Sequence, residues 1–405
     1  MENRPLHFLC ITSYFKGEAF LRSCKEQGNK VYLITSKKLQ HEAWPWDHID
    51  DVYYMEEDEN NHWNMEHLIN GIAYKMRDIK FDRFVSLDDF DVEKAAHLRE
   101  NFRIPGMGET TARYFRDKLA MRMKAHEAGI PVPEFTALFH NQDIHEYTQR
   151  VSPPWMLKPR LAASAAGIKK IHSVEELWHQ LDKLGDERPK YLLEKFAPGD
   201  VYHVDALNVN GKVVFSRVSQ YINPPFDVAH GGGIFRSVTT EFGSKDDKEL
   251  TKLNKAVMKA FGMNYSASHT EFIKGHEDGK YYFLETSSRV GGANLADMVE
   301  ASSGINLWAE WAKIETALAK GETYELPEVE KNYAGIVVSL SRYEKPGTHS
   351  FTDPEICWRM NKDWHIGLIV KSDNQKRVIE LLDNYARRIA KNFHASAPAP
   401  DKPTN

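Results

Sequence analysis

Short apolar runs alternate with amphipathic stretches through the first hundred residues of the chain. Four runs are typical of buried strands: 6–12, 30–36, 51–55 and 82–89. The stretches 17–28 and 64–79 carry apolar residues at helical spacing between them. Strands that alternate with helices in this way predict a parallel sheet with right-handed crossovers.

A long amphipathic stretch, 108–129, predicts a single helix that Gly129 ends. After it, short apolar runs surround a second helix expected at 173–185. These runs predict another set of strands: 134–139, 155–160, 167–171 and 190–196.

The second half of the chain predicts two hairpins. The first covers 202–221, because Asn210-Gly211 is a preferred two-residue turn. The second covers 272–285 and follows a helix expected at 246–262. Further elements are expected at 292–303, 306–320 and 373–393 as helices, and at 333–340 and 364–372 as strands. The small, polar and proline-rich residues 394–405 are expected to be disordered.

The composition is that of a globular protein large enough for two or three domains. The chain has 405 residues, of which 41% are hydrophobic and 27% charged. A net charge of −5 gives no general attraction to nucleic acid or to an anionic membrane. The cysteines Cys10, Cys24 and Cys357 are too few and too widely spaced for a disulfide framework or a zinc site, so a reducing cytosol fits best. We find no signal-peptide pattern and no run near the roughly 18 apolar residues of a membrane span.

Two acids stand in the second hairpin. A three-residue turn at 277–279, with glycine in the left-handed position, would pair Ile273 with Phe283 and Glu271 with Glu285. The two carboxylates would then lie on one face with Cβ atoms about 5 Å apart. Like charges in this position destabilise a sheet, so a cation is expected between them.

The chemistry of this face favours a divalent metal. Carboxylates are hard oxygen ligands that suit Mg²⁺ or Mn²⁺, with phosphate completing the shell. Ser287 and Arg289 continue on the same face, and Arg289 could bind a phosphate or carboxylate through two hydrogen bonds. The alternative is a solvent-facing hairpin whose acids bind no metal.

Two lysines lie beside features that can hold phosphate. Lys158 ends an expected strand before an alanine-rich loop that contains Ser164, and small residues let backbone N–H groups approach a phosphate. Lys118 lies on the helix expected at 108–129. Either lysine alone is more often a solvated surface charge. Neither the P-loop nor the dinucleotide-binding fingerprint is present.

Five motifs, in their order and spacing, resemble the ATP-grasp superfamily, which includes biotin carboxylase, D-alanine–D-alanine ligase and the L-amino-acid ligases. The motifs are RDKLAMRMKAHEAGIPVP, MLKPRLAASAAGI, YLLEKFAPGDVYHVD, HTEFI and FLETSSRVGG, and the resemblance covers about residues 5–392. It implies an α/β protein with the ATP-grasp fold. The expected parts are an N-terminal parallel-sheet domain (1–112), a small lid subdomain (113–195), a large antiparallel-sheet subdomain with the metal site (196–325), a C-terminal segment that completes the large domain (326–392) and a disordered tail (393–405).

The resemblance implies ATP as a substrate and a set of residues that contact it. Lys118 and Lys158 would contact the phosphates, the loop 162–167 would close over them, and Glu194 with the backbone of 195–197 would hold the adenine edge. The full ATP-binding set is Lys118, Lys158, Ser164, Gly167, Glu194, Lys195, Phe196, Ala197 and His203.

The resemblance also implies a metal and phosphoryl-transfer site. Glu271 and Glu285 match the two magnesium-bridging acids, and Arg289 matches the arginine that steadies the transferred phosphate. Ser287 stands where asparagine is common, and as a poorer ligand it could act through water.

The ribose position departs from the family pattern. Val201 stands where the family often has an acid, which leaves Asp200, His203 or Asp205 to take that place. The loop over the phosphates also has alanines where glycines are usual. Neither departure removes the metal acids, the lysines or the arginine.

The chemistry that the resemblance implies is ATP-dependent activation of a carboxylate as an acyl phosphate, followed by attack of an amine and release of ADP and phosphate. Two alternatives stay open. One is a carboxylase in which bicarbonate is phosphorylated, and the other is a non-catalytic nucleotide-binding protein.

Substrate contacts are less defined. The segment 221–235 with its glycines could hold a carboxylate or phosphate, or could form only a mobile loop. The candidates there are Tyr221, His230, Gly231, Gly232 and Arg236. Asp88 and Asp89 end an expected strand, where either could bind an amino group or cap the next helix. Small carboxylate and amine substrates, a cytoplasmic location and no nucleic-acid or membrane partner are expected, and a homodimer stays open.

Overall fold

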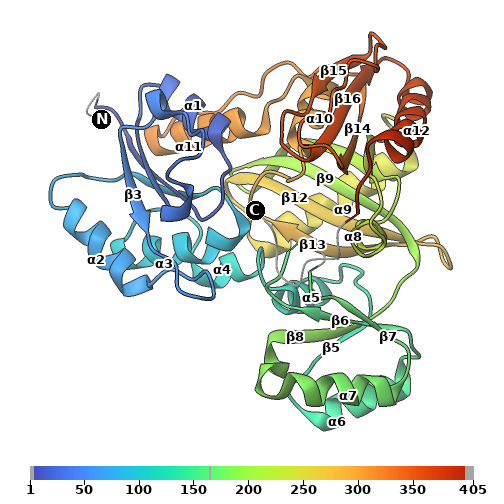
Figure 1. Cartoon of the computed structure of the whole chain (residues 1–405). Coiled ribbons are helices and arrows are strands. Elements are labelled where there is room, and N and C mark those ends of the chain that lie inside the picture. Colours follow the sequence, from blue (N-terminus) through green and yellow to red (C-terminus); the bar gives the residue numbers. More distant parts are fainter. Residues whose placement is uncertain (1–3, 164–165, 397–405) are drawn as a thin grey trace.

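The computed structural model describes residues 4–163 and 166–396 (Figure 1). A four-stranded sheet forms its N-terminal part, with strands β1 (His7–Thr12), β2 (Lys30–Ser36), β3 (Asp51–Met55) and β4 (Arg83–Ser86). The strand order is β3-β2-β1-β4, and every pairing is parallel, as predicted. The helices of this part are α1 (Glu18–Glu26), α2 (Met65–Lys75) and α3 (Val92–Phe102).

The N-terminal sheet shares a core with a distant helix, α11 (Leu307–Lys320). In Figure 1, α1 lies directly beside α11, and the rings of Phe20 and Trp311 meet edge to face at 5.1 Å between centroids. Buried residues of β1, β2, α1 and α11 belong to one apolar cluster. The first hundred residues are therefore held against the rest of the molecule by apolar packing.

The single helix expected at 108–129 is wrong, because the chain forms two helices there. α4 (Glu109–Arg113) ends before α5 (Lys118–Glu127) begins. Asp117 caps α5 by accepting from the Leu119 N–H at 3.0 Å. An aspartate in that position satisfies N–H groups that have no partner within the helix, so it starts a new helix.

A small antiparallel sheet with two helices on one face forms a unit that we call the lid (residues 135–195). Its strands are β5 (Phe135–Ala137), β6 (Trp155–Pro159), β7 (Lys169–Ile171) and β8 (Tyr191–Lys195), in the order β5-β8-β6-β7. The helices α6 (Asn141–Arg150) and α7 (Val174–Leu184) cover its outer face (Figure 1). Trp155, Leu177 and Leu193 are fully buried between the two layers. The four predicted strands and the predicted helix α7 are confirmed.

The large sheet has eight antiparallel strands in the order β13-β12-β9-β10-β11-β14-β16-β15. The strands are β9 (Gly199–Val209), β10 (Lys212–Tyr221), β11 (Phe235–Thr239), β12 (Ser266–Gly275), β13 (Tyr281–Ser287), β14 (Tyr333–Leu340), β15 (Ile356–Arg359) and β16 (His365–Ser372). The helices that accompany it, besides α11, are α8 (Pro225–Gly231), α9 (Lys245–Phe261), α10 (Leu295–Ser303) and α12 (Gln375–Asn392). The predicted turn between β9 and β10 is confirmed, since Asn210 and Gly211 both have positive φ.

The hairpin β12–β13 pairs Glu271 with Glu285 as predicted, although part of the predicted register is wrong. Ile273 pairs with Tyr282 and not with Phe283. A β-bulge at Leu284 then shifts the register by one residue, so the two acids still face each other. The Leu284 carbonyl, freed from regular pairing, accepts a hydrogen bond from Arg122 on α5.

Candidate functional site

A cavity of about 620 Å³ lies between α5, the lid and the large sheet. This volume is within the roughly 300–1,000 Å³ that small-molecule sites occupy. Many of the residues predicted for a site line it: Lys118, Lys158, Glu194, Lys195, Phe196, Ala197, Glu271, Glu285, Ser287 and Arg289. Segments that are far apart in the sequence therefore meet around one cavity.

The Glu285 carboxylate is paired with a lysine from α5. Lys118 Nζ lies 2.9 Å from Glu285 Oε2, and it also donates to the Ala162 carbonyl at 2.7 Å. Burial favours a higher pKa for Glu285, but Lys118 and then Lys158 outweigh it and hold this pKa below its usual value. About a third of the Glu285 side chain (37%) stays accessible from the cavity, so the ionised carboxylate can take a further ligand.

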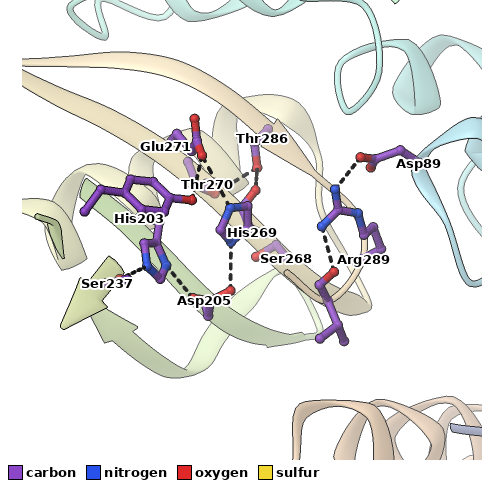
Figure 2. A network of polar contacts seen from close by, with 12 residues as sticks. Asp89, His203, Asp205, Ser237, Ser268, His269, Thr270, Glu271, Thr286 and Arg289 are labelled. Atoms are coloured by element: carbon purple, nitrogen blue, oxygen red, sulfur yellow. Dashed lines mark hydrogen bonds and ion pairs between the residues drawn. The ribbon is translucent and has the colours of Figure 1, made fainter. Parts of the chain in front are cut away.

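The Glu271 carboxylate is supported from beneath by a buried polar network (Figure 2). The Tyr221 hydroxyl donates to Glu271 at 2.8 Å, and His269 Nε2 lies 3.7 Å from the same oxygen. His269 Nδ1 contacts Asp205 at 2.8 Å, and the other Asp205 oxygen contacts His203 at 2.7 Å. The sheet register explains the arrangement, since His203 pairs with Glu271 and Asp205 with His269 between β9 and β12.

His269 supplies a positive charge to this network. Burial favours a lower pKa for His269, but Asp205 and then Glu271 raise it to about 10, so the imidazole is protonated at neutral pH. His203, Asp205 and His269 place their ligand atoms within 4.8 Å of one another. Both Asp205 oxygens already contact an imidazole, so this buried group is satisfied by its own hydrogen bonds.

Glu194 forms a buried ion-pair group with two cations at the lid side of the cavity. Its carboxylate contacts Lys158, and it lies 2.8 Å from Arg122. Only 2% of the Glu194 side chain is exposed. Burial favours a higher pKa, yet Arg122 and Lys158 hold the pKa of Glu194 below its usual value. The carboxylate thus fixes both cations at the cavity wall.

Arg289 is held by an acid from the N-terminal part. Its guanidinium pairs with Asp89, the first residue of the short 3-10 helix η3 (Asp89–Asp91) after β4, and donates to the Val290 carbonyl at 2.7 Å (Figure 2). Arg289 and then Arg116 hold the pKa of Asp89 well below its usual range despite its burial. The acid that pairs with Arg289 is therefore Asp89, and not Glu271 or Glu285. Asp88 caps the short helix that follows, by accepting from the Phe90 N–H at 3.1 Å.

Other predicted residues do not line the cavity among the described residues. His203 is fully buried, and its ring nitrogens contact Asp205 and Ser237. Arg236 pairs with Asp383 on α12 at 2.5 Å. Gly231 and Gly232 lie at the C-terminal end of α8, and Gly167 takes a positive φ next to Pro159. Ser164 and the side chain of His230 lie outside the described part of the chain.

Three cationic groups at the site were not predicted from the sequence. Arg122 follows Lys118 by one helical turn, a spacing that could have placed both on one face of α5. Arg116 directly precedes the capping Asp117 and lines the cavity. His269 stands two residues before Glu271, so strand alternation would have put it on the same face.

The parallel N-terminal sheet, the antiparallel lid and the large antiparallel sheet around one cavity form the ATP-grasp fold, as the motifs predict. An L-amino acid ligase from Bacillus licheniformis superposes with a TM-score of 0.74 at 17% identity, over 97% of this chain and 99% of that one. The biotin carboxylase domain of the Hydrogenobacter thermophilus 2-oxoglutarate carboxylase, solved with MgADP and bicarbonate, superposes with a TM-score of 0.71 at 17% identity, over 97% of this chain and 91% of that one.

The relatives that are similar in sequence include several ligases. An L-arginine-specific L-amino acid ligase from Bacillus subtilis is 30% identical over 237 residues, which is 56% of this chain and 56% of that ligase. A D-alanine–D-alanine ligase from Neisseria gonorrhoeae is 22% identical over 204 residues, 49% of this chain and 66% of that ligase. The match therefore spans less than two thirds of either relative. No protein-family model matches the chain. Within the described residues, no helix combines the length and the apolar character needed to cross a bilayer.

Proposed function

We propose that this chain is an ATP-dependent ligase that activates a carboxylate as an acyl phosphate and joins it to an amine. The observation that carries this proposal is the facing pair Glu271 and Glu285 at the cavity, with Lys118 and Arg289 beside them. Two anionic groups and two cations around one small-molecule cavity suit the transfer of a phosphoryl group. The ligase relatives support the same reaction class.

The residues present fit a divalent metal ion. Glu271, Glu285 and Ser287 offer oxygen atoms only, and all three line the cavity. The Glu285 carboxylate is ionised and accessible, and the hydroxyl of Tyr221 occupies only one Glu271 oxygen. We propose that these residues hold Mg²⁺ or Mn²⁺, which when bound would offset charge on the ATP phosphates.

The nucleotide would lie between the lid and the large sheet. Lys118 and Lys158 both line the cavity and are fixed by Glu285 and Glu194, so their charges are positioned before ATP arrives. The segment 195–197 also lines the cavity and would hold the adenine edge. Because the Glu194 carboxylate contacts two cations, its role would be to position Lys158 and Arg122.

Arg289 and Asp89 would act on the reacting groups of the substrates. The oxygen of the reacting carboxylate would attack the γ-phosphorus as the bond to ADP breaks, and the amine would then attack the acyl carbon as phosphate leaves. Arg289, held by Asp89, would neutralise charge on the moving phosphoryl group. One Asp89 oxygen is buried without a partner among the described residues, and this oxygen would accept from a substrate ammonium group.

A carboxylase is the second candidate. The solved neighbours include enzymes of that class, but at 17% identity or less they establish only the fold. The curated relatives that share more sequence with this chain are ligases, and we therefore place the ligase first.

A phosphate-release screen with Mg²⁺ and ATP distinguishes the candidates. The test would compare L-amino acids singly and in pairs, small carboxylates, and bicarbonate alone. Release that depends on a carboxylate together with an amine supports the ligase. Release with bicarbonate as the acid would favour the carboxylase, and ATP binding without any release would contradict both. The cytoplasmic location and the homodimer stay predictions from sequence.

A further inference from the structure

Most of the buried cations that line the cavity are bonded to a carboxylate, and Arg116 is not. Lys118, Lys158, Arg122 and Arg289 each pair with a carboxylate, as described above. Arg116 also lines the cavity and is only 8% exposed, yet its side chain makes no hydrogen bond or ion pair with the described residues. Its charge acts on Asp89, whose pKa it lowers, but the Asp89 carboxylate is hydrogen-bonded to Arg289. Two guanidinium groups therefore share one carboxylate, and the N–H donors of Arg116 are available to a ligand.

The position of Arg116 is set by the break between α4 and α5. Its guanidinium carbon lies 4.4 Å from the centre of the Phe90 ring, in the short 3-10 helix that follows β4. The Phe90 ring in turn contacts the Tyr14 ring, in the loop after β1, with the ring centres 4.9 Å apart. Arg116 therefore lies against the N-terminal part, whereas Lys158, Glu194 and the segment 195–197 belong to the lid side. If the segment 195–197 holds the adenine as proposed, Arg116 lies at the part of the cavity that the N-terminal residues line.

The proposed reaction leaves one anionic group without a partner. When two amino acids are joined, the carboxylate of the first is consumed, but the carboxylate of the amine-bearing substrate stays free. In a cavity of about 620 Å³ that carboxylate would be largely desolvated and would need a cation. Arg289 is already paired with Asp89, so Arg116 is the buried cation left to receive it.

We propose that Arg116 binds the free carboxylate of the amine-bearing substrate, so that this substrate is an amino acid rather than a simple amine. The inference rests on the proposed ligase function. It gives a specificity role to a residue that directly precedes the N-cap of α5. A planar guanidinium accepts a carboxylate through two parallel hydrogen bonds, which also fixes the direction in which the amine points.

The test compares the amino acid that serves best as the amine substrate with its α-amide, in wild type, Arg116→Met and Arg116→Lys. Wild type should show a KM about ten- to a hundredfold higher for the amide than for the amino acid. Arg116→Met should raise the KM for the amino acid by a similar factor and leave the KM for the amide unchanged. Arg116→Lys should recover part of the difference. Arg113→Met is the matched control, because Arg113 is 62% exposed at the end of α4, and all its constants should equal those of wild type.

Three results would overturn the proposal. The first is an equal KM for the amino acid and its amide in wild type. The second is a loss of ATP affinity as the main effect of Arg116→Met. The third is an Arg116→Met variant in which only the KM for the acyl substrate changes. If wild type turns over no pair, the proposed function itself fails. Calorimetric binding of the amino acid and of its amide in the presence of MgADP then tests Arg116 without turnover, because the variant should weaken binding of the amino acid only.

Discussion

Each of the two facing acids has its own cationic neighbour before any ligand binds. Lys118 neutralises Glu285, and the protonated His269 lies under Glu271. Two carboxylates opposite each other on a sheet would otherwise repel. The protein therefore tolerates the pair without a metal, and the acids are available as oxygen ligands.

Glu285→Gln tests the metal acid directly. The variant keeps the shape of the side chain but loses the charge, so ADP formation should fall to background while the fold is retained. Glu277→Gln, at an exposed position in the turn of the same hairpin, should have wild-type turnover. Near-normal ADP formation by Glu285→Gln, measured with a coupled assay, would exclude Glu285 from the metal site.

Arg289→Lys separates a catalytic role from a structural one. Lysine can keep the ion pair with Asp89 but loses the planar fork of the guanidinium. We expect a strong fall in kcat with little change in ATP affinity or melting temperature, because other cations hold the ground-state complex. A normal kcat with a lowered melting temperature would show that Arg289 only ties η3 to the large sheet.

At the residue scale, sequence patterns predicted the groups that lie next to recognisable motifs. Glu271, Glu285 and Arg289 were predicted because hairpin alternation places them on one face. The charge network beneath them was not predictable, because Asp205 and His269 meet only when β9 pairs with β12. The place of the Arg116 guanidinium at the cavity, over the Phe90 ring, is likewise a result of packing, since the neighbouring motif marks only Lys118.

At the element scale, the β12–β13 hairpin shows how a register prediction can be right at one place and wrong at another. Gly275 donates to the Lys280 carbonyl, so the loop between them holds one residue more than the expected turn, which shifts the pairing at Ile273. The bulge at Leu284 restores it at the acids, and its carbonyl contacts Arg122. No local pattern marks that bulge, because Arg122 comes from a helix more than a hundred residues earlier.

Other elements were not predicted from the sequence, or were predicted as one element, because local patterns do not mark them. The helix expected at 108–129 contains apolar residues at helical spacing throughout, and only Asp117 signals the break. The strand β11 (Phe235–Thr239) and the helix α8 lie in a segment whose glycines and prolines are typical of a loop. β11 forms because β10 and β14 provide partners on both sides.

The pairing of β9 with β12 brings His269 next to Asp205, and this contact should make the free energy of unfolding depend on pH. The pKa of His269 in the folded protein is raised to about 10, above its ordinary value of 6.5. The protonated imidazole therefore stabilises the fold fully below about pH 6.5, and this contribution is lost as the pH rises towards 10. The difference in unfolding free energy between wild type and His269→Gln should shrink over that range.

Denaturant unfolding at a series of pH values measures this difference. His179→Gln, at an exposed position on α7, is the control and should not change the pH profile. A difference between wild type and His269→Gln that stays constant from pH 6.5 to 10 would mean that His269 is neutral in the folded protein.

At the scale of the whole molecule, the N-terminal sheet and α11 are joined by a buried ion pair as well as by apolar packing. Arg83 on β4 pairs with Glu315 on α11, and both side chains are 5% exposed. Glu315→Gln would leave the Arg83 charge buried without its partner, so unfolding free energy should fall by about 3–5 kcal/mol.

The same variant tests whether the two parts unfold together. We expect one cooperative transition at lower denaturant concentration, reported equally by fluorescence and circular dichroism. Glu322→Gln, at an exposed position just beyond α11, should leave the transition unchanged. Two separate transitions in wild type would show that the shared core does not couple the parts.

The fate of a labelled carboxylate oxygen tests the proposed reaction most directly. The acyl substrate would carry a heavy oxygen isotope in its carboxylate, and the released phosphate would be analysed by mass spectrometry after a single turnover. Attack of that carboxylate on the γ-phosphorus predicts one labelled oxygen in the phosphate and an amide product that retains the other. Unlabelled phosphate, with its new oxygen taken from water, would contradict acyl-phosphate formation and show that the protein only hydrolyses ATP.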